Sequence, residues 1–329
     1  MRLALALLAL AGCEDCSHAP TAPTTPTAAV VPPPLVAEPP TVICPPPLTV
    51  TAPTSAGAVV LYPLPDSQRG EGVVTVSCSP ASGATFPVGV TMVTCVATDA
   101  LNRTSTCSLN VTVSPPPRLS RTRIMAFGDS VTEGQLVVPD TDSVEVITRP
   151  DIAYPAVLSQ LLAARYSDQR ITVFNRGRAT EHAAGSLSRF LTTFLTDTPD
   201  VVVLLDGYND LLTPHGGFEI LEAVAGVNEL ATEARRRGAR VFICTLSPSK
   251  PGRRQIAMSA IRETNDRLRQ VARGENAYLV DVFSALLPHV DENVGSDGLH
   301  LTIAGYRRVA ETVFAAIRAD LELRTPPVQ

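Results

Sequence analysis

From residue 121 onward, short apolar runs alternate with longer segments of helical character, and this alternation constrains the fold more than any other feature of the sequence. The apolar runs cover residues 122–127, 171–175, 200–206, 239–245 and 277–282, and the helix candidates cover residues 151–166, 181–196, 217–237, 254–273 and 302–319. Val201–Leu205 is apolar at every position, which is typical of a strand that helices cover on both faces. The pattern predicts a three-layer α/β/α fold with a mainly parallel sheet over residues 121–322.

Residues 41–114 follow a different pattern, in which apolar and polar side chains alternate with a period of two. The alternation is clear at Val93, Cys95 and Ala97, and turn signals such as Ser79-Pro80 separate the runs. Short alternating runs with frequent turns predict an all-β sandwich. The run Pro115-Pro116-Pro117 then predicts a stiff joint at residues 115–120.

The first 13 residues, MRLALALLALAGC, resemble a bacterial lipoprotein signal. Their apolar stretch is too short to span a bilayer and is typical of an export signal. The last four of them resemble a lipobox, in which Cys13 would be lipidated and become the new N-terminus. The alternative is an ordinary signal peptide with a Cys by chance. Residues 14–40 are rich in Pro, Thr and Ala and predict an extended tether, and residues 323–329 form a tail.

The seven Cys residues separate into groups. Cys44, Cys78, Cys95 and Cys107 form an even set within residues 41–114, and an exported chain meets an oxidising compartment, so we expect two disulfides. Cys78 and Cys95 flank a predicted hairpin, whereas the other two lie on the first and last predicted strands. We therefore predict the pairs Cys44–Cys107 and Cys78–Cys95. Cys244 lies alone on an apolar run, which predicts a buried core residue.

Polar landmarks follow the apolar runs of the α/β part in a fixed order. They are Gly128-Asp129-Ser130, Asn175-Arg176-Gly177, Gly207-Tyr208-Asn209-Asp210 and Asp297-Gly298-Leu299-His300. Sites in open α/β sheets lie beyond the carboxyl ends of the strands, so we expect these segments to gather at one edge. Each alone has a simpler interpretation, such as an Asp-Gly turn or a helix cap. Together they supply the nucleophile, base, carboxylate and oxyanion donors that a serine esterase needs.

These four segments resemble, in order, the sequence blocks of the SGNH hydrolases, also called the GDSL esterase/lipase family, over roughly residues 121–320. The resemblance implies that Ser130 is the nucleophile, His300 the general base and Asp297 the carboxylate that orients it. It also implies an oxyanion hole formed by the backbone N–H groups of Ser130 and Gly177 and the side-chain amide of Asn209. One departure is Thr180, which stands where the second block often has a later Gly.

The N-terminal strands resemble a HYR (hyalin repeat) module, an immunoglobulin-like domain. The sequence segments that match include Ile43-Cys44-Pro45, Gly83-Ala84-Thr85-Phe86-Pro87-Val88-Gly89 and Val93-Thr94-Cys95-Val96-Ala97-Thr98-Asp99. The resemblance implies an immunoglobulin-like sandwich in front of the hydrolase. Between the first and second blocks, residues 135–150 form a polar and β-rich insert that we expect to shape substrate access, with a structure that the sequence does not predict.

Other classes of function find little support in the sequence. The net charge is −5, and residues of both charges are interspersed along the chain, so the sequence has no basic patch that would bind nucleic acid. The chain has no dinucleotide, Walker or H-E-x-x-H motif and no G-x-S-x-G elbow, so we expect no cofactor and no metal. The remaining histidines, His18, His182, His215 and His289, are weaker candidates for the base.

The leading hypothesis is an exported serine esterase, lipid-anchored in the bacterial cell envelope. Its substrate would be a small-molecule or polysaccharide ester, with either lysophospholipase- or thioesterase-like activity or carbohydrate acetyl esterase activity. The alternatives are a surface adhesion or carbohydrate-binding protein with an inactive hydrolase domain, and an acyltransferase that uses the same residues. The sequence does not distinguish hydrolysis from transfer, and it does not give the acyl chain length.

Overall fold

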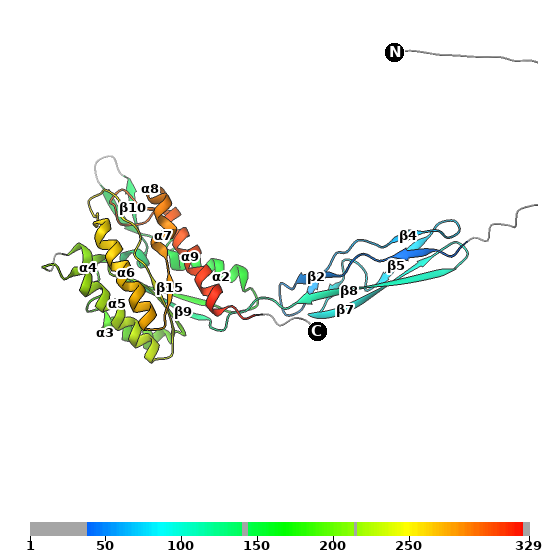
Figure 1. Ribbon diagram of the computed structural model, residues 1–329, viewed down its shortest axis with the longest axis horizontal. Helices are drawn as coiled ribbons and strands as arrows, with labels where there is room; N and C mark the ends of the chain where they lie inside the picture. Colours follow the sequence, from blue (N-terminus) through cyan, green and yellow to red (C-terminus); the bar gives the residue numbers. More distant parts are fainter. Residues whose placement is uncertain (1–37, 140–143, 214–215, 325–329) are drawn as a thin grey trace, which may run out of the picture.

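The computed structural model describes residues 38–139, 144–213 and 216–324. The proposed lipidation site Cys13, the signal peptide, most of the tether and the end of the tail lie outside the described residues, as do His18 and His215. The described chain forms two domains, one built of strands and the other of strands and helices (Figure 1). Within these ranges, none of the helices is long and apolar enough to cross a membrane.

The C-terminal domain contains a five-stranded parallel sheet in the order β12-β9-β13-β14-β15. Each strand lies within two residues of an apolar run that predicted it: β9 Arg123–Gly128, β12 Thr172–Gly177, β13 Val201–Leu205, β14 Arg240–Cys244 and β15 Tyr278–Val280. All five residues of β13 are buried, as expected for a central strand covered on both faces. The parallel sheet is therefore confirmed.

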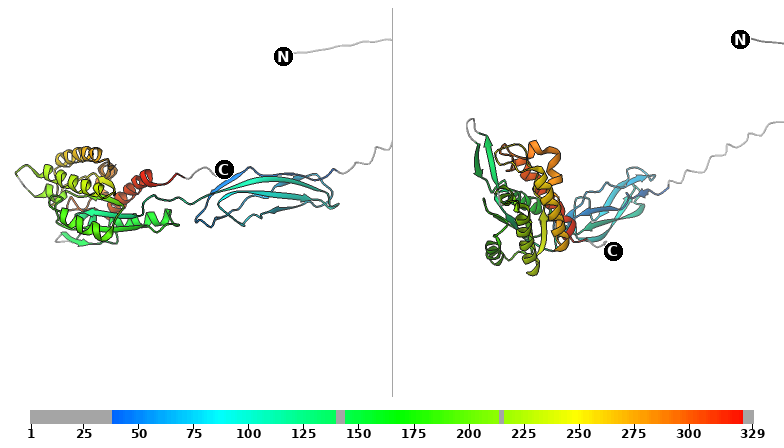
Figure 2. Two further views of the ribbon diagram at one scale, coloured as in Figure 1. Left: turned by 90° about the horizontal axis from the view of Figure 1, so that it is seen from below. Right: turned by 60° about the vertical axis from the view of Figure 1, so that its left-hand side comes forward.

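Helices cover both faces of this sheet (Figures 1 and 2). On one face α2 (Tyr154–Arg165) packs against α9 (Ile303–Leu321). On the other face α5 (Glu219–Arg236) lies between α3 (Leu187–Asp197) and α6 (Met258–Gly274). The predicted three-layer arrangement is thus present. Five shorter helices were not predicted, because a segment of one or two turns gives no periodic pattern: α1 (Ser130–Glu133), α4 (Tyr208–Leu212), α7 (Val282–Leu286), η1 (Leu287–His289) and α8 (Val290–Asn293).

The N-terminal domain is rich in strands, as predicted. Its main sheet has the order β2-β8-β7-β5, formed by Leu48–Thr51, Thr104–Ser114, Gly89–Thr98 and Thr75–Ser79. Two short antiparallel ladders complete it, β1 (Thr41–Ile43) with β4 (Asp66–Gln68) and β3 (Ala58–Val59) with β6 (Thr85–Phe86). One core joins these parts, because Tyr62 and Phe86 are buried in the same cluster as Val93 and Val111.

The five cysteines within the described residues occupy positions that agree with their predicted roles. The structure joins Cys44 to Cys107 and Cys78 to Cys95, the pairing expected from the sequence. Cys78 and Cys95 face each other in the register of β5 and β7. Cys244 is a free thiol buried on β14, and burial raises its pKa well above the ordinary value. These features make Cys244 a core residue rather than a reactive one.

The insert between the first two blocks forms a β-hairpin, which the sequence did not predict. Its strands are β10 (Gln135–Pro139) and β11 (Val144–Thr148), and the tip between them lies outside the described residues. The Tyr306 hydroxyl on α9 donates a hydrogen bond of 2.6 Å to the carbonyl of Gln135. This contact fixes the base of the hairpin close to the end of α1, which begins at Ser130.

Candidate active site

Ser130 follows β9 directly and is the first residue of α1. Asp129 caps this helix, because its Oδ1 accepts a hydrogen bond of 3.0 Å from the Val131 N–H. A Cβ on Gly128 would lie 2.0 Å from the Leu205 carbonyl oxygen, so only glycine allows β9 and β13 to approach this closely. The strand therefore ends in a tight turn that holds Ser130 at the carboxyl edge of the sheet, with 3% of its surface exposed.

A chain of hydrogen bonds connects Asp297 to Ser130 through His300. His300 Nε2 lies 3.0 Å from Ser130 Oγ, and its Nδ1 lies 2.6 Å from Asp297 Oδ2. Burial by itself raises the pKa of Asp297, but hydrogen bonds from the His300 side chain and from backbone N–H groups offset this and lower the pKa below its usual range. An ionised Asp297 fixes the proton on Nδ1, so Nε2 is left to accept the Ser130 hydroxyl proton.

The loop before α9 holds Asp297 and His300 in place. Asp297 Oδ1 accepts hydrogen bonds of 3.0 Å from the N–H groups of both Leu299 and His300, so the carboxylate organises its own turn. The segment after β14 supports this turn from outside, because the Ser249 hydroxyl donates to the Gly298 carbonyl at 2.6 Å. The base and its carboxylate are thus fixed before any substrate binds, as preorganisation requires.

Asn209 lies in the first turn of α4, directly after β13, and only 7% of it is exposed. Its side-chain Nδ2 donates a hydrogen bond of 2.9 Å to the Glu181 carbonyl. An amide nitrogen carries two N–H groups, so one remains for a substrate oxygen. The neighbouring Asp210 accepts from the N–H groups of Ala183 and Ala184, at 2.8 and 3.1 Å. Helix α4 is therefore bound tightly to the loop that follows β12.

The structure does not support Gly177 as an oxyanion donor, so this part of the prediction is corrected. Its N–H is already used, because it donates a hydrogen bond of 2.9 Å to Asn175 Oδ1. The glycine is needed here for packing, since a Cβ on Gly177 would lie 2.0 Å from the Glu133 backbone nitrogen at the end of α1. Gly177 thus brings β12 against the helix that carries Ser130, which is a structural role.

Thr180, three residues later, was missed as a site residue. Its φ of +63° is in the left-handed region that favours glycine, and its N–H has no partner among the residues that the structure describes. The sequence carried a signal, since Thr180 stands where the second block often has its later glycine. A left-handed residue with a free N–H next to the segment that binds Asn209 is a better candidate for an oxyanion donor than Gly177.

Three buried carboxyl groups lie at the ends of β9 and β13. Burial, the largest cause, and the charge of Asp210 together raise the pKa of Asp129 to about 7, although hydrogen bonds from the N–H groups of Val131 and Tyr208 act to lower it. The pKa of Asp206 is raised well above its ordinary value, first by burial and then by the charges of Asp129 and Asp210. Asp206 Oδ2 has no hydrogen-bond partner in the described part of the chain. Burial and the neighbouring carboxylates therefore favour the protonated, neutral form of Asp206.

Replacement of Asp206 by Asn should stabilise the protein more at alkaline than at acidic pH. A raised pKa means that the folded state keeps a proton that the unfolded chain releases above about pH 4, so wild-type stability falls as pH rises. Asn mimics the neutral acid and removes this loss. We expect the gain in the free energy of unfolding to be larger at pH 8 than at pH 5, by about 1.4 kcal/mol for each pH unit over which the folded state keeps the proton of Asp206. Urea denaturation at both pH values measures the gain, and a gain independent of pH would contradict a neutral Asp206.

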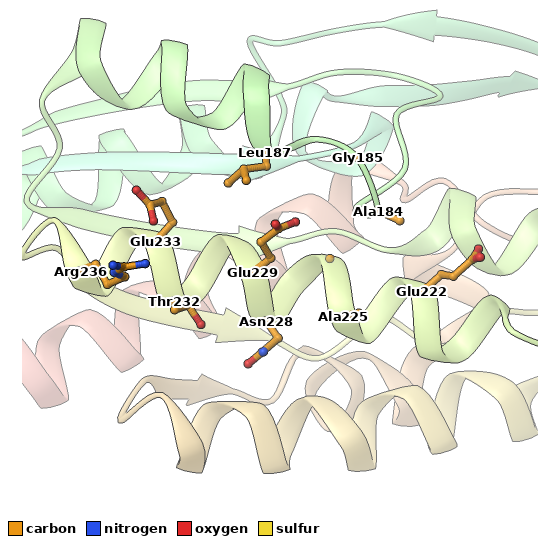
Figure 3. Close-up of a pocket in the computed structure, with 11 residues that line it drawn as sticks. Ala184, Gly185, Leu187, Glu222, Ala225, Asn228, Glu229, Thr232, Glu233 and Arg236 are labelled. Carbon is orange, nitrogen blue, oxygen red and sulfur yellow. The ribbon is translucent and has the colours of Figure 1, made fainter.

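Other groups in the described ranges add little to this site. No group of three or more His, Cys, Asp or Glu residues there could hold a metal ion. The His182 side chain faces Asp210, with 3.9 Å between Nδ1 and Oδ1. A cavity of about 710 Å³ lies between α5 and the start of α3 (Figure 3), but its lining includes none of Ser130, Asp297 and His300.

Comparisons with known proteins agree with this architecture. Residues 126–308, more than half of the chain, match the GDSL-like Lipase/Acylhydrolase family, and residues 37–113 match the HYR domain. The solved lipase/acylhydrolase from Enterococcus faecalis is 25% identical with a TM-score of 0.50, over 62% of this chain and 100% of that one. An acetylxylan esterase from Geobacillus stearothermophilus is 19% identical with a TM-score of 0.50, over 60% and 94%. No curated protein matches the chain.

Proposed function

The chain belongs to the GDSL-like lipase/acylhydrolase family and is a serine ester hydrolase, and we propose that it cleaves carboxylic esters through an acyl-enzyme on Ser130. The observation that carries this proposal is the hydrogen-bond chain from Asp297 through His300 to Ser130, with distances of 2.6 and 3.0 Å. A serine hydroxyl becomes a useful nucleophile only when a base accepts its proton in the same step. His300 is oriented for that task.

The reaction would proceed in two halves. Ser130 Oγ attacks the ester carbonyl carbon while its proton moves to His300 Nε2, and the carbonyl oxygen becomes an oxyanion. The imidazolium, held by the Asp297 carboxylate, then gives this proton to the leaving alcohol as the ester C–O bond breaks. Water repeats the sequence on the acyl-enzyme, with His300 as its base, and releases the acid and free Ser130.

The oxyanion would be held by three N–H groups from three segments. They are the backbone N–H of Ser130 at the start of α1, the second N–H of the Asn209 amide and the backbone N–H of Thr180. Support comes from the single hydrogen bond of the Asn209 amide and the unpaired N–H of Thr180 among the described residues. Each such donor contributes typically ~10²–10³ in rate, because it bonds the oxyanion more strongly than the ground-state carbonyl.

We also propose that the enzyme is exported and anchored to a membrane of the cell envelope through lipidated Cys13. The support is in the sequence alone, where an export signal ends in a lipobox and a Pro-rich tether follows. The several acyl chains of a lipidated N-terminal Cys bind a bilayer firmly, whereas a single chain binds only marginally. Membrane fractionation of wild type and Cys13→Ser tests this, and unmodified wild-type protein in the soluble fraction would refute the anchor.

A panel of esters tests the proposed activity and identifies the substrate. We propose carbohydrate acetyl esters as the first class to test, because a structural relative is an acetylxylan esterase. The panel should contain p-nitrophenyl esters from acetyl to palmitoyl, acetylated xylan and a lysophospholipid. We expect the wild-type protein to hydrolyse at least one class of ester in the panel. The Ser130→Ala variant should hydrolyse none of them. Failure of the wild-type protein to hydrolyse any ester, with the fold intact, would refute the proposed function.

A further inference from the structure

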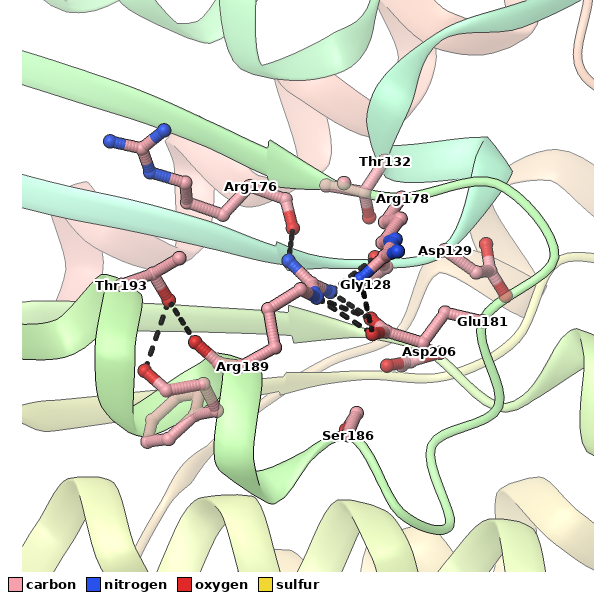
Figure 4. A network of polar contacts seen from close by, with 12 residues as sticks. Gly128, Asp129, Thr132, Arg176, Arg178, Glu181, Ser186, Arg189, Thr193 and Asp206 are labelled. Carbon is pink, nitrogen blue, oxygen red and sulfur yellow. Dashed lines mark hydrogen bonds and ion pairs between the residues drawn. The ribbon is translucent and has the colours of Figure 1, made fainter.

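Arg189, on the first turns of α3, lies at the centre of the polar network shown in Figure 4. Its Nη1 donates a hydrogen bond of 2.8 Å to the carbonyl of Arg176, near the end of β12. Its Nη2 donates one of 3.3 Å to the carbonyl of Gly128, the last residue of β9. The guanidinium stacks on the Phe127 ring, with 3.9 Å from Cζ to the ring centroid. One side chain therefore binds the ends of two adjacent strands, two residues before Ser130.

The same guanidinium binds the loop that follows β12. Arg189 Nε lies 2.8 and 2.6 Å from the two carboxylate oxygens of Glu181, and Nη2 forms a further short ion pair with the same group. The backbone carbonyl of Glu181 in turn accepts the hydrogen bond from the Asn209 amide. Glu181 also directly follows Thr180. The side chain of Glu181 is thus anchored to Arg189, and its backbone anchors the residues of the oxyanion hole.

We propose that Arg189 is a positioning residue for the oxyanion hole, acting through its ion pair with Glu181. The inference rests on the proposed function. Arg189 connects the nucleophile strand to the loop that carries Thr180 and orients Asn209, so it sets the distance between Ser130 and these donors. A misplacement of about 1 Å at a reacting centre can lower the rate on the order of 10²-fold, which is why such a connection matters for turnover.

The chemistry of the guanidinium explains why this position needs arginine. Its planar fork presents five N–H donors in fixed directions, and here they reach a carboxylate and two strand carbonyls together. A lysine ammonium is a single point charge that cannot span these acceptors in the same geometry. The exposed fraction of the side chains in this ion pair is low, 18% for Arg189 and 15% for Glu181, so solvent screens it less than a surface pair.

Arg178 offers a matched control on the same carboxylate. Its Nη1 lies 3.9 Å from Glu181 Oε1, but 66% of its side chain is exposed, and its guanidinium donates to neither strand end. Arg178→Gln therefore removes the same charge next to the same partner without disturbing the connection. Arg189→Gln removes the connection between the strand ends and Glu181 in full. Arg189→Lys keeps the charge and removes the connection in part. Glu181→Gln keeps the backbone carbonyl that binds Asn209 and weakens the contacts of the side chain with Arg189 and, more weakly, with Arg178.

The experiment measures kcat and KM for the best ester of the panel, together with the affinity for phenylboronic acid, which forms a tetrahedral anionic adduct with an active serine. We expect Arg189→Gln to lower kcat roughly 10- to 100-fold and to change KM about 3-fold or less. Boronate binding should weaken in parallel, because the oxyanion donors bind the transition state more strongly than the substrate. Arg189→Lys and Glu181→Gln should give intermediate losses, and Arg178→Gln should resemble wild type.

Several outcomes would overturn the positioning role. If Arg189→Gln kept wild-type kcat, or lost boronate affinity no more than Arg178→Gln, the connection would be structural only. If it failed to fold, Glu181→Gln and Arg189→Lys would decide the question through the same ratio of kcat to boronate affinity. Equal losses for Arg178→Gln and Arg189→Gln would show a nonspecific effect of charge. An inactive wild type would overturn both this role and the proposed function, whereas an active wild type with an unaffected Arg189→Gln would overturn this role alone.

Discussion

Replacement of Ser130 by Ala is expected to abolish ester hydrolysis while the protein stays folded. The acyl-enzyme cannot form without Oγ, and loss of the nucleophile in serine hydrolases lowers kcat on the order of 10⁶-fold. The effect on stability should be small, because the hydroxyl makes one side-chain hydrogen bond, to His300 Nε2. The measurement is kcat with p-nitrophenyl acetate, together with the midpoint of thermal unfolding.

Ser188→Ala is the matched control for this experiment, since Ser188 is an exposed serine on α3 in the same domain. It should keep wild-type kcat. Activity above about a hundredth of wild type in Ser130→Ala would contradict the assigned nucleophile, because the remaining oxyanion donors and binding groups account for only ~10³–10⁴ of the rate over water. A large fall in the unfolding midpoint would instead show that the serine matters for packing.

Replacement of Asp297 by Asn is expected to lower kcat on the order of 10⁴-fold. The Asp297 carboxylate accepts a hydrogen bond from the Nδ1–H group of His300, with 2.6 Å between Nδ1 and Oδ2. An amide nitrogen in its place would stabilise the opposite tautomer, with the proton on Nε2. Nε2 could then no longer accept the Ser130 proton. Loss of the negative charge also destabilises the imidazolium form of the base, so the acid limb of kcat/KM plotted against pH should move to lower pH.

Asn209→Ala separates this effect from the loss of an oxyanion donor. It should lower kcat roughly 10²–10³-fold, but an amide does not titrate, so the pH dependence of kcat/KM should stay as in wild type. The pH profiles of both variants form the measurement. If Asn209→Ala shifted the acid limb and Asp297→Asn did not, the roles assigned to these two residues would be wrong.

The sequence predicted the elements that carry a long pattern. Apolar runs such as Val201–Leu205 become buried strands because helices on both faces leave no polar side, and this dictates the parallel sheet. Ser130, Asn209 and His300 were placed at one edge because each follows an apolar run or precedes a helix in a fixed order. The structure brings Ser130, Asp297 and His300 into hydrogen-bond contact there.

The parts of the site that the sequence did not predict depend on directions of single groups. The N–H of Gly177 is used by the side chain of Asn175, and no pattern of residue types reveals which way a backbone N–H points at a strand end. Asp206 was missed because a carboxyl group after an apolar strand is usually solvated, whereas here it is buried without a partner for Oδ2. Arg189 follows the helical pattern of a surface residue, and only the three-dimensional structure shows its contacts with both strand ends.

The most direct test of the account is covalent labelling of the intact protein with a fluorophosphonate, followed by peptide mapping. The Ser130 hydroxyl lies 3.0 Å from His300 Nε2, so Ser130 should be the reactive serine at neutral pH. We expect one equivalent of label on the peptide that contains Ser130, in parallel with the loss of esterase activity, and no label in Ser130→Ala. Labelling of a different serine, or complete inhibition without modification of Ser130, would contradict the account.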